Sequence, residues 1–478
     1  MAAIITNSNK KSMFVTQDGK NVLFTFILVS SLFLLWGFCN GLIDVMDKHF
    51  QDELGLTKSQ SAWVQFAHYL GYFLMSIPAG WLASKLGYKG GIIAGLLIVA
   101  AGGLWFIPAT NISGMVQSGG VSSNTAFVAF LAGVCLIATG LTFLETIANP
   151  YTTVLGDQQF AATRINLAQS CNGIGWIFGP IVGSMYFYST DATGHSTGSQ
   201  TLYIPYAAIA GVVIVLSVIF YFANVPDIKM EDDYHLDDAT PGVSRSIWSH
   251  PHFVMAVAAQ FFYVAAQAGI FSFFINYMTS EVPAIPAAWD AGMNSFAGSA
   301  GFLRDWLTGW FETSKAGVLM LSNKGASNLA SLGFVFFLAG RFTGALLLKK
   351  YSAHKILGLY ASLNVVATLL VFCKLGWLSA LCVFLSYFFM SIMFPTIFAL
   401  GIFGLGARAK KASSYIVMAI MGGAILPKLM GYIADQFDMS RSFIVPMVCF
   451  CFVAFYGFYW PKLSKADSLR GVQAGAGH

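Results

Sequence analysis

The chain has 478 residues, of which 56% are hydrophobic and only 10% are charged. An ordinary soluble domain carries about 25% charged residues, so this composition excludes a soluble globular protein and indicates one that crosses a membrane repeatedly. The net charge of +5 does not require a nucleic-acid partner, because basic loops on one side of a membrane protein account for it. The seven cysteines lack a metal-binding CxxC spacing, and they predict neither a disulfide framework nor a metal centre.

Twelve apolar runs follow one another along the chain, each near the length of roughly 20 residues that a helix needs to cross a bilayer. They cover residues 22–46, 61–86, 90–108, 126–150, 166–188, 204–223, 252–278, 329–348, 356–372, 378–403, 413–434 and 443–460. This pattern predicts an all-α polytopic membrane protein with twelve transmembrane helices in two six-helix halves. The polar residues 1–21 are followed by a full-length span, which argues against a cleaved signal peptide.

Polar segments divide the chain further. An acidic linker at residues 224–251 separates the first half, residues 22–223, from the second half, residues 252–460, and residues 461–478 form a polar tail. A polar insertion at residues 279–328 contains Trp289, Trp306 and Trp310, and we expect it to form an amphipathic element on the outer face. Both tails are expected in the cytoplasm, because seventeen of the 26 lysines and arginines then lie in cytoplasmic segments and seven in outer segments.

Two carboxylates lie inside predicted spans. Glu145 is about two-thirds of the way through the fourth span, in the run Gly140 to Gly156, and Asp44 lies in the first span. A charged side chain inside a bilayer is costly unless it is neutralised, paired or facing water, so these two acids are candidates for proton coupling. A faint repeat of a small-residue helix end and a basic loop, at residues 80–89 and 344–355, relates the two halves and predicts a substrate site between them.

The fifth span presents Gln169, Asn172 and Trp176 on one helical face, together with Asn166. Amides beside an aromatic ring suit a sugar, whose hydroxyl groups bind amides and whose C–H face packs on a ring. The alternative is that these amides hold helices together, which is common in membrane bundles.

Other spans add candidate site residues of the same kinds. The seventh span offers Tyr263, Gln267 and Phe271, and the tenth offers Phe394 before a proline that predicts a bend. His68 in the second span is a possible proton relay, because imidazole titrates near neutral pH, although a neutral hydrogen-bonded ring is the more common role.

Two cations also lie inside spans. Arg341 in the eighth span needs an anion or carbonyl partner, and structural pairing is the expected role. Lys428 follows Gly422, Gly423 and a proline, where the eleventh span is expected to be broken, and it is a candidate charge partner inside the cavity.

Several runs together resemble the fucose–galactose–glucose:proton symporter family of the major facilitator superfamily. They are Leu144 to Pro150, Arg164 to Ser170, Gly340 to Gly344, Phe394 to Phe398, the Gly422-Gly423 pair and Gly431 to Asp435. The resemblance implies that Asp44 and Glu145 are the acidic pair of that family and that Gln169 and Asn172 contact the sugar. Asn40 and Asn149, in the same motifs as the two acids, are added to the expected substrate-binding set.

These observations predict proton-coupled symport of a hexose of the glucose, galactose, mannose or fucose type by alternating access. Gly41, Ile43, Phe271 and Lys428 depart from the fucose transporter of the family and favour another hexose.

A sodium-coupled or uncoupled sugar carrier of the same fold remains an alternative. So does a drug antiporter, which the Gly179-Pro180 sequence alone suggests. We expect no enzyme activity and no cofactor besides the coupling ion, and a monomer in a bacterial inner membrane whose partners are the sugar and the lipid bilayer.

Overall fold

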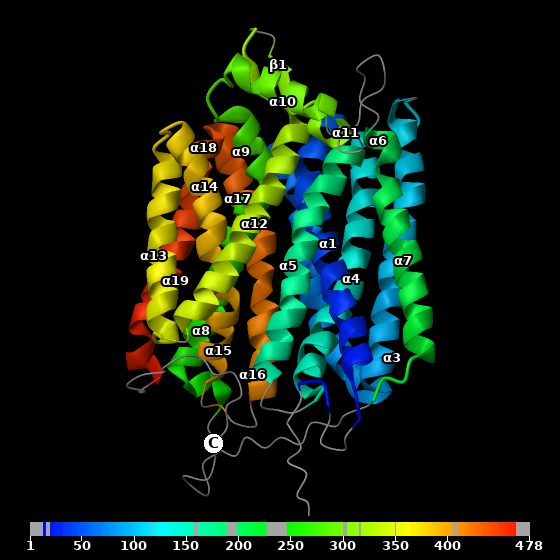
Figure 1. Ribbon diagram of the computed structural model, residues 1–478, viewed down its shortest axis with the longest axis vertical. Helices are drawn as coiled ribbons and strands as arrows, with labels where there is room; N and C mark the ends of the chain where they lie inside the picture. Colours follow the sequence, from blue (N-terminus) through cyan, green and yellow to red (C-terminus); the bar gives the residue numbers. More distant parts are fainter. Residues whose placement is uncertain are drawn as a thin grey trace, which may run out of the picture.

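The protein is a bundle of long, nearly parallel helices (Figure 1). The computed structural model describes residues 13–15, 20–117, 119–156, 161–188, 198–226, 246–299, 304–314, 317–348, 350–403, 405 and 409–464. The first half, called the N half, consists of α1 (Leu23–Leu54), α2 (Lys58–Ser61), α3 (Trp63–Gln117), α4 (Ser123–Val154), α5 (Ala161–Tyr186), α6 (Gly198–Thr201) and α7 (Tyr203–Phe222).

The second half, called the C half, starts with η2 (Ile247–Ser249), α8 (Pro251–Ser272) and α9 (Phe274–Ser280). It continues with α10 (Ala287–Ser299), α11 (Arg304–Leu307), β1 (Phe311–Thr313), β2 (Leu319–Leu321), α12 (Asn323–Leu348) and α13 (Ala353–Phe372). It ends with α14 (Trp377–Met390), α15 (Met393–Ile402), α16 (Ala409–Met418), η5 (Ala419–Met421), α17 (Gly422–Gln436), α18 (Met439–Ser442) and α19 (Ile444–Ser464).

Tracing these elements through the described residues gives twelve crossings, which confirms the predicted fold class. Helix α3 makes two of them, because its path reverses at Gly87, whose φ of 69° is accessible mainly to glycine. Ten segments of the described residues are long and apolar enough to cross a membrane by composition alone. The other two crossings are the first part of α3, which carries His68, and α5, which carries Gln169 and Asn172.

Two crossings are interrupted where the sequence predicts it. Helix α14 ends at Met390 and α15 begins at Met393, just before Pro395. A short 3₁₀ turn, η5, separates α16 from α17 immediately before Gly422. Helix interruptions at membrane depth are expected around a binding site, where the freed backbone groups find other partners.

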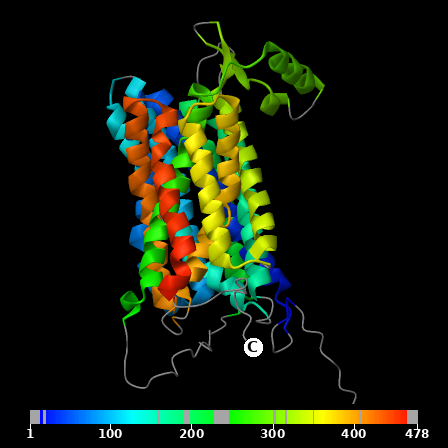
Figure 2. The same ribbon diagram turned by 90° about the vertical axis from the view of Figure 1, so that its left-hand side faces the viewer.

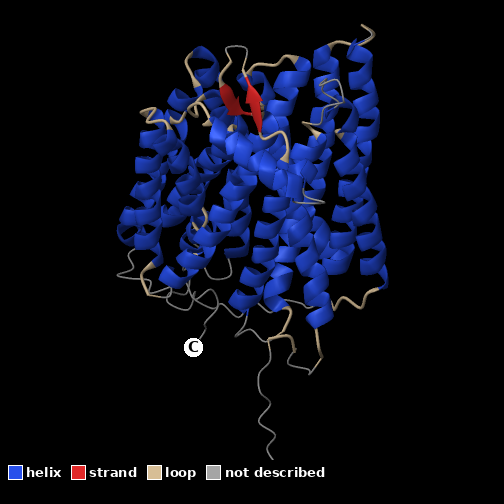
Figure 3. Cartoon of the chain, turned by 45° about the horizontal axis from the view of Figure 1, so that its top comes forward, coloured by secondary structure: helices blue, strands red, loops and turns tan. Residues whose placement is uncertain are grey.

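The ends of the bundle differ. One end, called the hairpin end, carries α10, α11 and the antiparallel pair β1–β2, in which Phe311 pairs with Leu321 (Figures 2 and 3). Helix α1 begins and α19 finishes at the opposite end, called the tail end (Figure 1). Helix α10 extends beyond the side of the bundle in Figure 2, and its Trp289 and Phe296 are 54% and 61% exposed. The surface role expected of this insertion stays a prediction.

Glycines allow α1 and α5 to pack with their backbones in contact. A Cβ atom at Gly37 would lie 2.0 Å from the carbonyl oxygen of Asn172, and one at Gly175 would lie 2.2 Å from the carbonyl oxygen of Leu34. Small residues at helix interfaces are the usual means of close approach in membranes, where water does not drive association. This contact fixes the position of α5, which bears three of the candidate sugar-binding residues, Gln169, Asn172 and Trp176.

The structure differs from the sequence prediction at two boundaries that matter for the site. Helix α1 continues to Leu54, about two turns past the predicted end at residue 46. Helix α12 begins at Asn323, inside the segment expected to be a polar insertion. Both extensions carry buried polar residues, among them Asp47 and Asn328.

Candidate functional site

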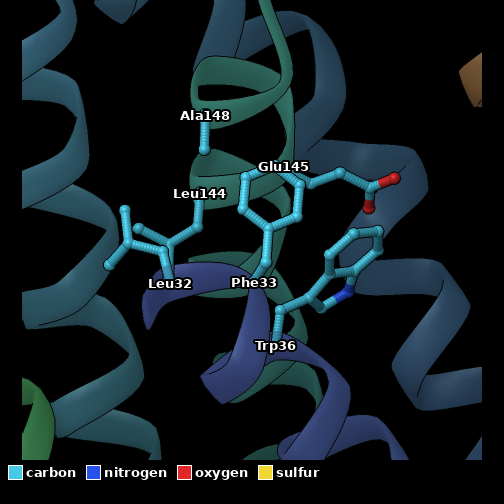
Figure 4. A pocket seen from close by; sticks show the side chains of 6 residues that line it. All are labelled: Leu32, Phe33, Trp36, Leu144, Glu145 and Ala148. Carbon is cyan, nitrogen blue, oxygen red and sulfur yellow. The ribbon is translucent and has the colours of Figure 1, made fainter. Parts of the chain in front are cut away.

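The side chain of Glu145, on α4, lies beside α1. Figure 4 shows it beside the indole of Trp36, with Leu32, Phe33, Leu144 and Ala148 lining the same narrow crevice. No hydrogen bond or ion pair reaches this carboxylate from the residues that the structure describes. The indole nitrogen of Trp36 instead donates to the hydroxyl of Tyr72 at 2.7 Å. Glu145 is therefore an acid in mainly apolar surroundings, where its neutral form is favoured.

A chain of hydrogen bonds connects Glu145 to the C half. The side-chain amide of Asn149 donates to the backbone carbonyl of Glu145 at 3.1 Å. The Gln169 amide donates to the side-chain oxygen of Asn149 at 3.0 Å, and the Arg341 guanidinium donates to the backbone carbonyl of Gln169 at 3.3 Å. These contacts run from α4 through α5 to α12. They bring together four of the residues predicted from the sequence.

Among the four residues joined by these hydrogen bonds, Arg341 alone belongs to the C half. Its guanidinium lies 4.8 Å from the ring centre of Phe337, and its buried Nε has no partner among the described residues. The predicted structural pairing is thus with a backbone carbonyl, and the unused donor leaves capacity for a ligand.

The other predicted residues of α5 pack in two directions, Asn172 against α1 of the same half and Trp176 against the C half. Asn172 donates its amide to the carbonyl of Phe33 at 3.3 Å, which uses one donor for helix packing. The ring of Trp176 contacts Phe334 at 4.8 Å and Phe271 at 5.6 Å between centroids. The side chain of Asn166 lies outside the described residues.

The predicted residues of the C half form an aromatic wall. Phe271 packs on Tyr387 with ring centroids 4.5 Å apart. Phe394 lies 6.4 Å from the ring of Tyr263, whose hydroxyl donates to the Met390 carbonyl at 3.0 Å. Gln267 is half-buried on the same helix, α8. Apolar rings with a few polar groups are the usual lining of a small-molecule site.

Several buried polar atoms of the bundle interior have no partner among the described residues. They are Asn40 Oδ1, His68 Nδ1, both amide atoms of Gln260, and the hydroxyl of Tyr387. Burying an unsatisfied polar group costs about 1–3 kcal/mol, so these atoms are suited to a ligand rich in hydroxyl groups or to water. The His68 ring packs against Tyr69 and Tyr72, and its role as a proton relay stays a prediction.

Asp44, the second predicted acid, lies on α1 facing α3. One of its oxygens accepts a hydrogen bond from the Gln65 amide at 3.1 Å, and the other has no partner among the described residues. One helical turn further on, Asp47 is fully buried, and the sequence prediction missed it because the first span was expected to end at residue 46. The spacing of three residues from Asp44 was the available signal, since it places both acids on one face.

Among the ion pairs between described residues, none joins Lys428 to these acids. Its ammonium nitrogen is 3.6 Å from the ring centre of Trp63, which begins α3 and is 37% exposed. The partner that the structure gives Lys428 is an aromatic face rather than a carboxylate. The predicted function of Lys428 as a charge partner in the cavity stays a prediction.

Residues 22–337 match the model of the Major Facilitator Superfamily, and the chain belongs to this superfamily of membrane transporters. It is 32% identical over 456 residues to the L-fucose-proton symporter of Escherichia coli K12, covering 91% of this chain and 93% of that protein. It is 30% identical over 449 residues to a glucose/galactose transporter of Brucella abortus, covering 94% and 96%. These relatives are transporters, and the chain is a transport protein rather than an enzyme.

Solved structures agree with this assignment. A crystal structure of the Escherichia coli fucose:proton symporter aligns with a TM-score of 0.62 at 30% identity, covering 92% of this chain and 99% of that one. A crystal structure of a D-xylose-proton symporter aligns with a TM-score of 0.64 at 12% identity, covering 94% and 100%, which supports the fold alone.

Proposed function

We propose that the protein is a proton-coupled hexose symporter that works by alternating access. The observation that carries the proposal is the Glu145 carboxylate, which has no partner among the described residues and adjoins the amide chain of Asn149 and Gln169 at the seam between the halves. The names of the relatives, an L-fucose-proton symporter and a glucose/galactose transporter, support both the ion and the substrate class.

The mechanism follows from the electrostatics of this seam. Glu145 takes up a proton while the cavity is open to the outside, and sugar then binds to the amides of α5 and the aromatic wall of the C half. A neutral Glu145 lowers the free-energy cost of enclosing the site in apolar surroundings. After the halves reorient, the proton and the sugar leave on the inner side. The membrane potential favours inward movement of one charge by about 2.3 kcal/mol per 100 mV.

The hairpin end is assigned to the outside and the tail end to the cytoplasm, in a bacterial inner membrane. The excess of lysine and arginine in segments at the tail end supports this orientation. The substrate is a hexose of the glucose, galactose, mannose or fucose type, and Gly41 and Ile43 in α1 favour a hexose other than fucose. A single chain contains both halves of the site, so a monomer suffices.

Counterflow in proteoliposomes tests the substrate class. The vesicles are loaded with one unlabelled sugar, and entry of the same labelled sugar is followed without an ion gradient. We expect at least one hexose to exchange. Mannitol and sucrose are the controls and are not expected to exchange. Failure of glucose, galactose, mannose, fucose and N-acetylglucosamine to exchange would contradict the proposal. Uptake driven by sodium but not by a pH gradient would show that sodium, and not the proton, is the coupling ion.

A further inference from the structure

Helix α1 holds two buried carboxylates one turn apart. Asp47 is 0% exposed and Asp44 is 6% exposed. Neither oxygen of Asp47, and only one oxygen of Asp44, has a hydrogen-bond partner among the described residues. Taking one unpaired charge out of water already costs several kcal/mol, and two like charges repel each other as well. The pair therefore does not hold two negative charges in this state.

The Gln65 side chain connects the two acids. Its amide nitrogen donates to Asp44 at 3.1 Å, and Gln65 also interacts electrostatically with Asp47, to which it forms no hydrogen bond. Gln65 is itself 1% exposed. A carboxamide has both donors and an acceptor, so it can stabilise an ionised acid on one side and a protonated acid on the other.

The other titratable groups near the pair have different partners or no charge. The Lys48 ammonium pairs with Asp52 at 2.7 Å, and His49 Nδ1 lies 2.8 Å from the Phe187 carbonyl oxygen. Beyond the end of α5, the hydroxyl of Tyr188 donates to the carbonyl of Val45 at 2.8 Å. Tyr69 of α3 and Tyr387 of α14 are the phenols that interact electrostatically with Asp44. None of the ion pairs between described residues includes Asp44 or Asp47, so no basic side chain of these ion pairs neutralises them.

The pair also lies on a polar stripe that leads to the hairpin end. Asp44, Asp47 and Gln51 are spaced by three and four residues and so share one face of α1. Gln51 lines a polar pocket of about 340 Å³ between the halves at that end, together with Lys48, Asp52 and Asn276. Asp47 is therefore between this pocket and Asp44.

We propose that Asp44, Gln65 and Asp47 form one proton-binding site, in which Asp47 is a second proton-carrying acid that loads from the hairpin end. Transfer of a proton from Asp47 to Asp44 breaks one O–H bond and forms another, and the net charge of the pair is unchanged. The proton-binding site itself does not depend on the proposed symport. Its consequence, that Asp47 sets the pH at which transport proceeds, rests on that proposed function.

The pH dependence of uptake in Asp47→Asn tests the consequence. An asparagine removes the second acid but keeps the shape of the side chain. Asp44 then loses its acidic neighbour and ionises more readily, so half-maximal uptake moves to a lower pH by about one unit. Asp47→Glu keeps a carboxyl group, so its pH dependence is expected to lie close to that of the wild-type chain. Glu53→Gln, on the same helix, is the control and is expected to leave the pH dependence unchanged. An unchanged pH dependence in Asp47→Asn overturns the proposal.

Infrared spectroscopy of the purified protein tests the site without any sugar. At neutral pH the wild-type chain is expected to show absorption from protonated carboxyl groups that is weaker in Asp47→Asn. An equal absorption in the wild-type chain and in Asp47→Asn would show that Asp47 carries no proton. If this difference in absorption is present but no sugar exchanges in counterflow, the proton site stands and the proposed symport fails. A change of this absorption on adding sodium would identify a sodium site and would overturn the proposal.

Discussion

Gln51 and Asn276 form a reciprocal pair of amide hydrogen bonds across the two halves at the hairpin end. The Asn276 amide donates to Gln51 at 2.6 Å and the Gln51 amide donates back at 3.4 Å. Nearby, the Asp435 carboxylate of α17 accepts the backbone N–H groups of Lys58 at 3.1 Å and of Ser59 at 2.8 Å. These contacts join α1 and α2 to α9 and α17, so they hold this end of the bundle closed.

Replacing Gln51 by alanine together with Asp435→Asn is expected to open the hairpin end. Each lost hydrogen bond is worth about 0.5–1.5 kcal/mol, and 1.4 kcal/mol corresponds to a tenfold change in an equilibrium. Labelling of a cysteine placed at Thr279, which lines the pocket there, should therefore accelerate about tenfold with a membrane-impermeant thiol reagent. Cys373 is exposed and must first be replaced by serine. Asp290→Asn on α10 is the matched control, and equal labelling rates in both variants would contradict the prediction.

The contact between α1 and α5 predicts a strong effect of one methyl group. In Gly37→Ala the added carbon would overlap the Asn172 carbonyl oxygen, only 2.0 Å away, so the helices must move apart. Overpacking of this kind destabilises by about 1–3 kcal/mol or more. Gly211→Ala in α7 is the control, because nothing lies within 4 Å of its added carbon. Thermal unfolding in detergent should show a lower midpoint for Gly37→Ala alone. A normal midpoint for Gly37→Ala would refute the close packing.

Arg341 is predicted to hold α5 in position for the sugar. Arg341→Met removes the hydrogen bond to the Gln169 carbonyl, and bonds to charged groups are worth about 1.5–3 kcal/mol. Because 1.4 kcal/mol corresponds to a tenfold change in an equilibrium, the KM for sugar should rise about tenfold or more. Arg441→Met is the comparison, because Arg441 also lies over a phenylalanine ring but is 55% exposed at the hairpin end. A similar KM in both variants would mean that Arg341 does not position the site.

Lys428 offers a test between two roles. If it acts through the ring of Trp63, Lys428→Met and Trp63→Leu each lower stability by about 0.5–2 kcal/mol, and the effects do not add in the double variant. The number of protons moved per sugar then stays at the wild-type value. A changed proton-to-sugar ratio in Lys428→Met would instead support the cavity role expected from the sequence.

The twelve crossings could be predicted because the length of an apolar run is a property of the sequence alone. The breaks before Pro395 and Gly422 could be predicted for a similar reason, since the residues that interrupt a helix are visible in the chain. The residues at which a span ends are harder to predict from the sequence. Helix α1 extends past Lys48, whose charge pairs with Asp52 one turn along the helix, and hydropathy does not register this contact.

The contacts of the site could be predicted only in part. Spacing placed Gln169 and Asn172 on one face, but not the donation from Gln169 to Asn149, which depends on how α4 and α5 are rotated. The sequence likewise placed Lys428 near a helix break without revealing that its side chain reaches Trp63. Such pairings are set by tertiary packing between residues far apart in the chain.

The most direct test of coupling through Glu145 compares exchange and accumulation in the same proteoliposomes. The wild-type chain is expected to concentrate the exchanged hexose when the outside is acidified, and sugar addition should drive protons inward. Glu145→Gln mimics the protonated acid, so it is expected to keep counterflow but to lose both accumulation and sugar-driven proton entry. Accumulation by Glu145→Gln at the wild-type level, with proton entry intact, would contradict the account.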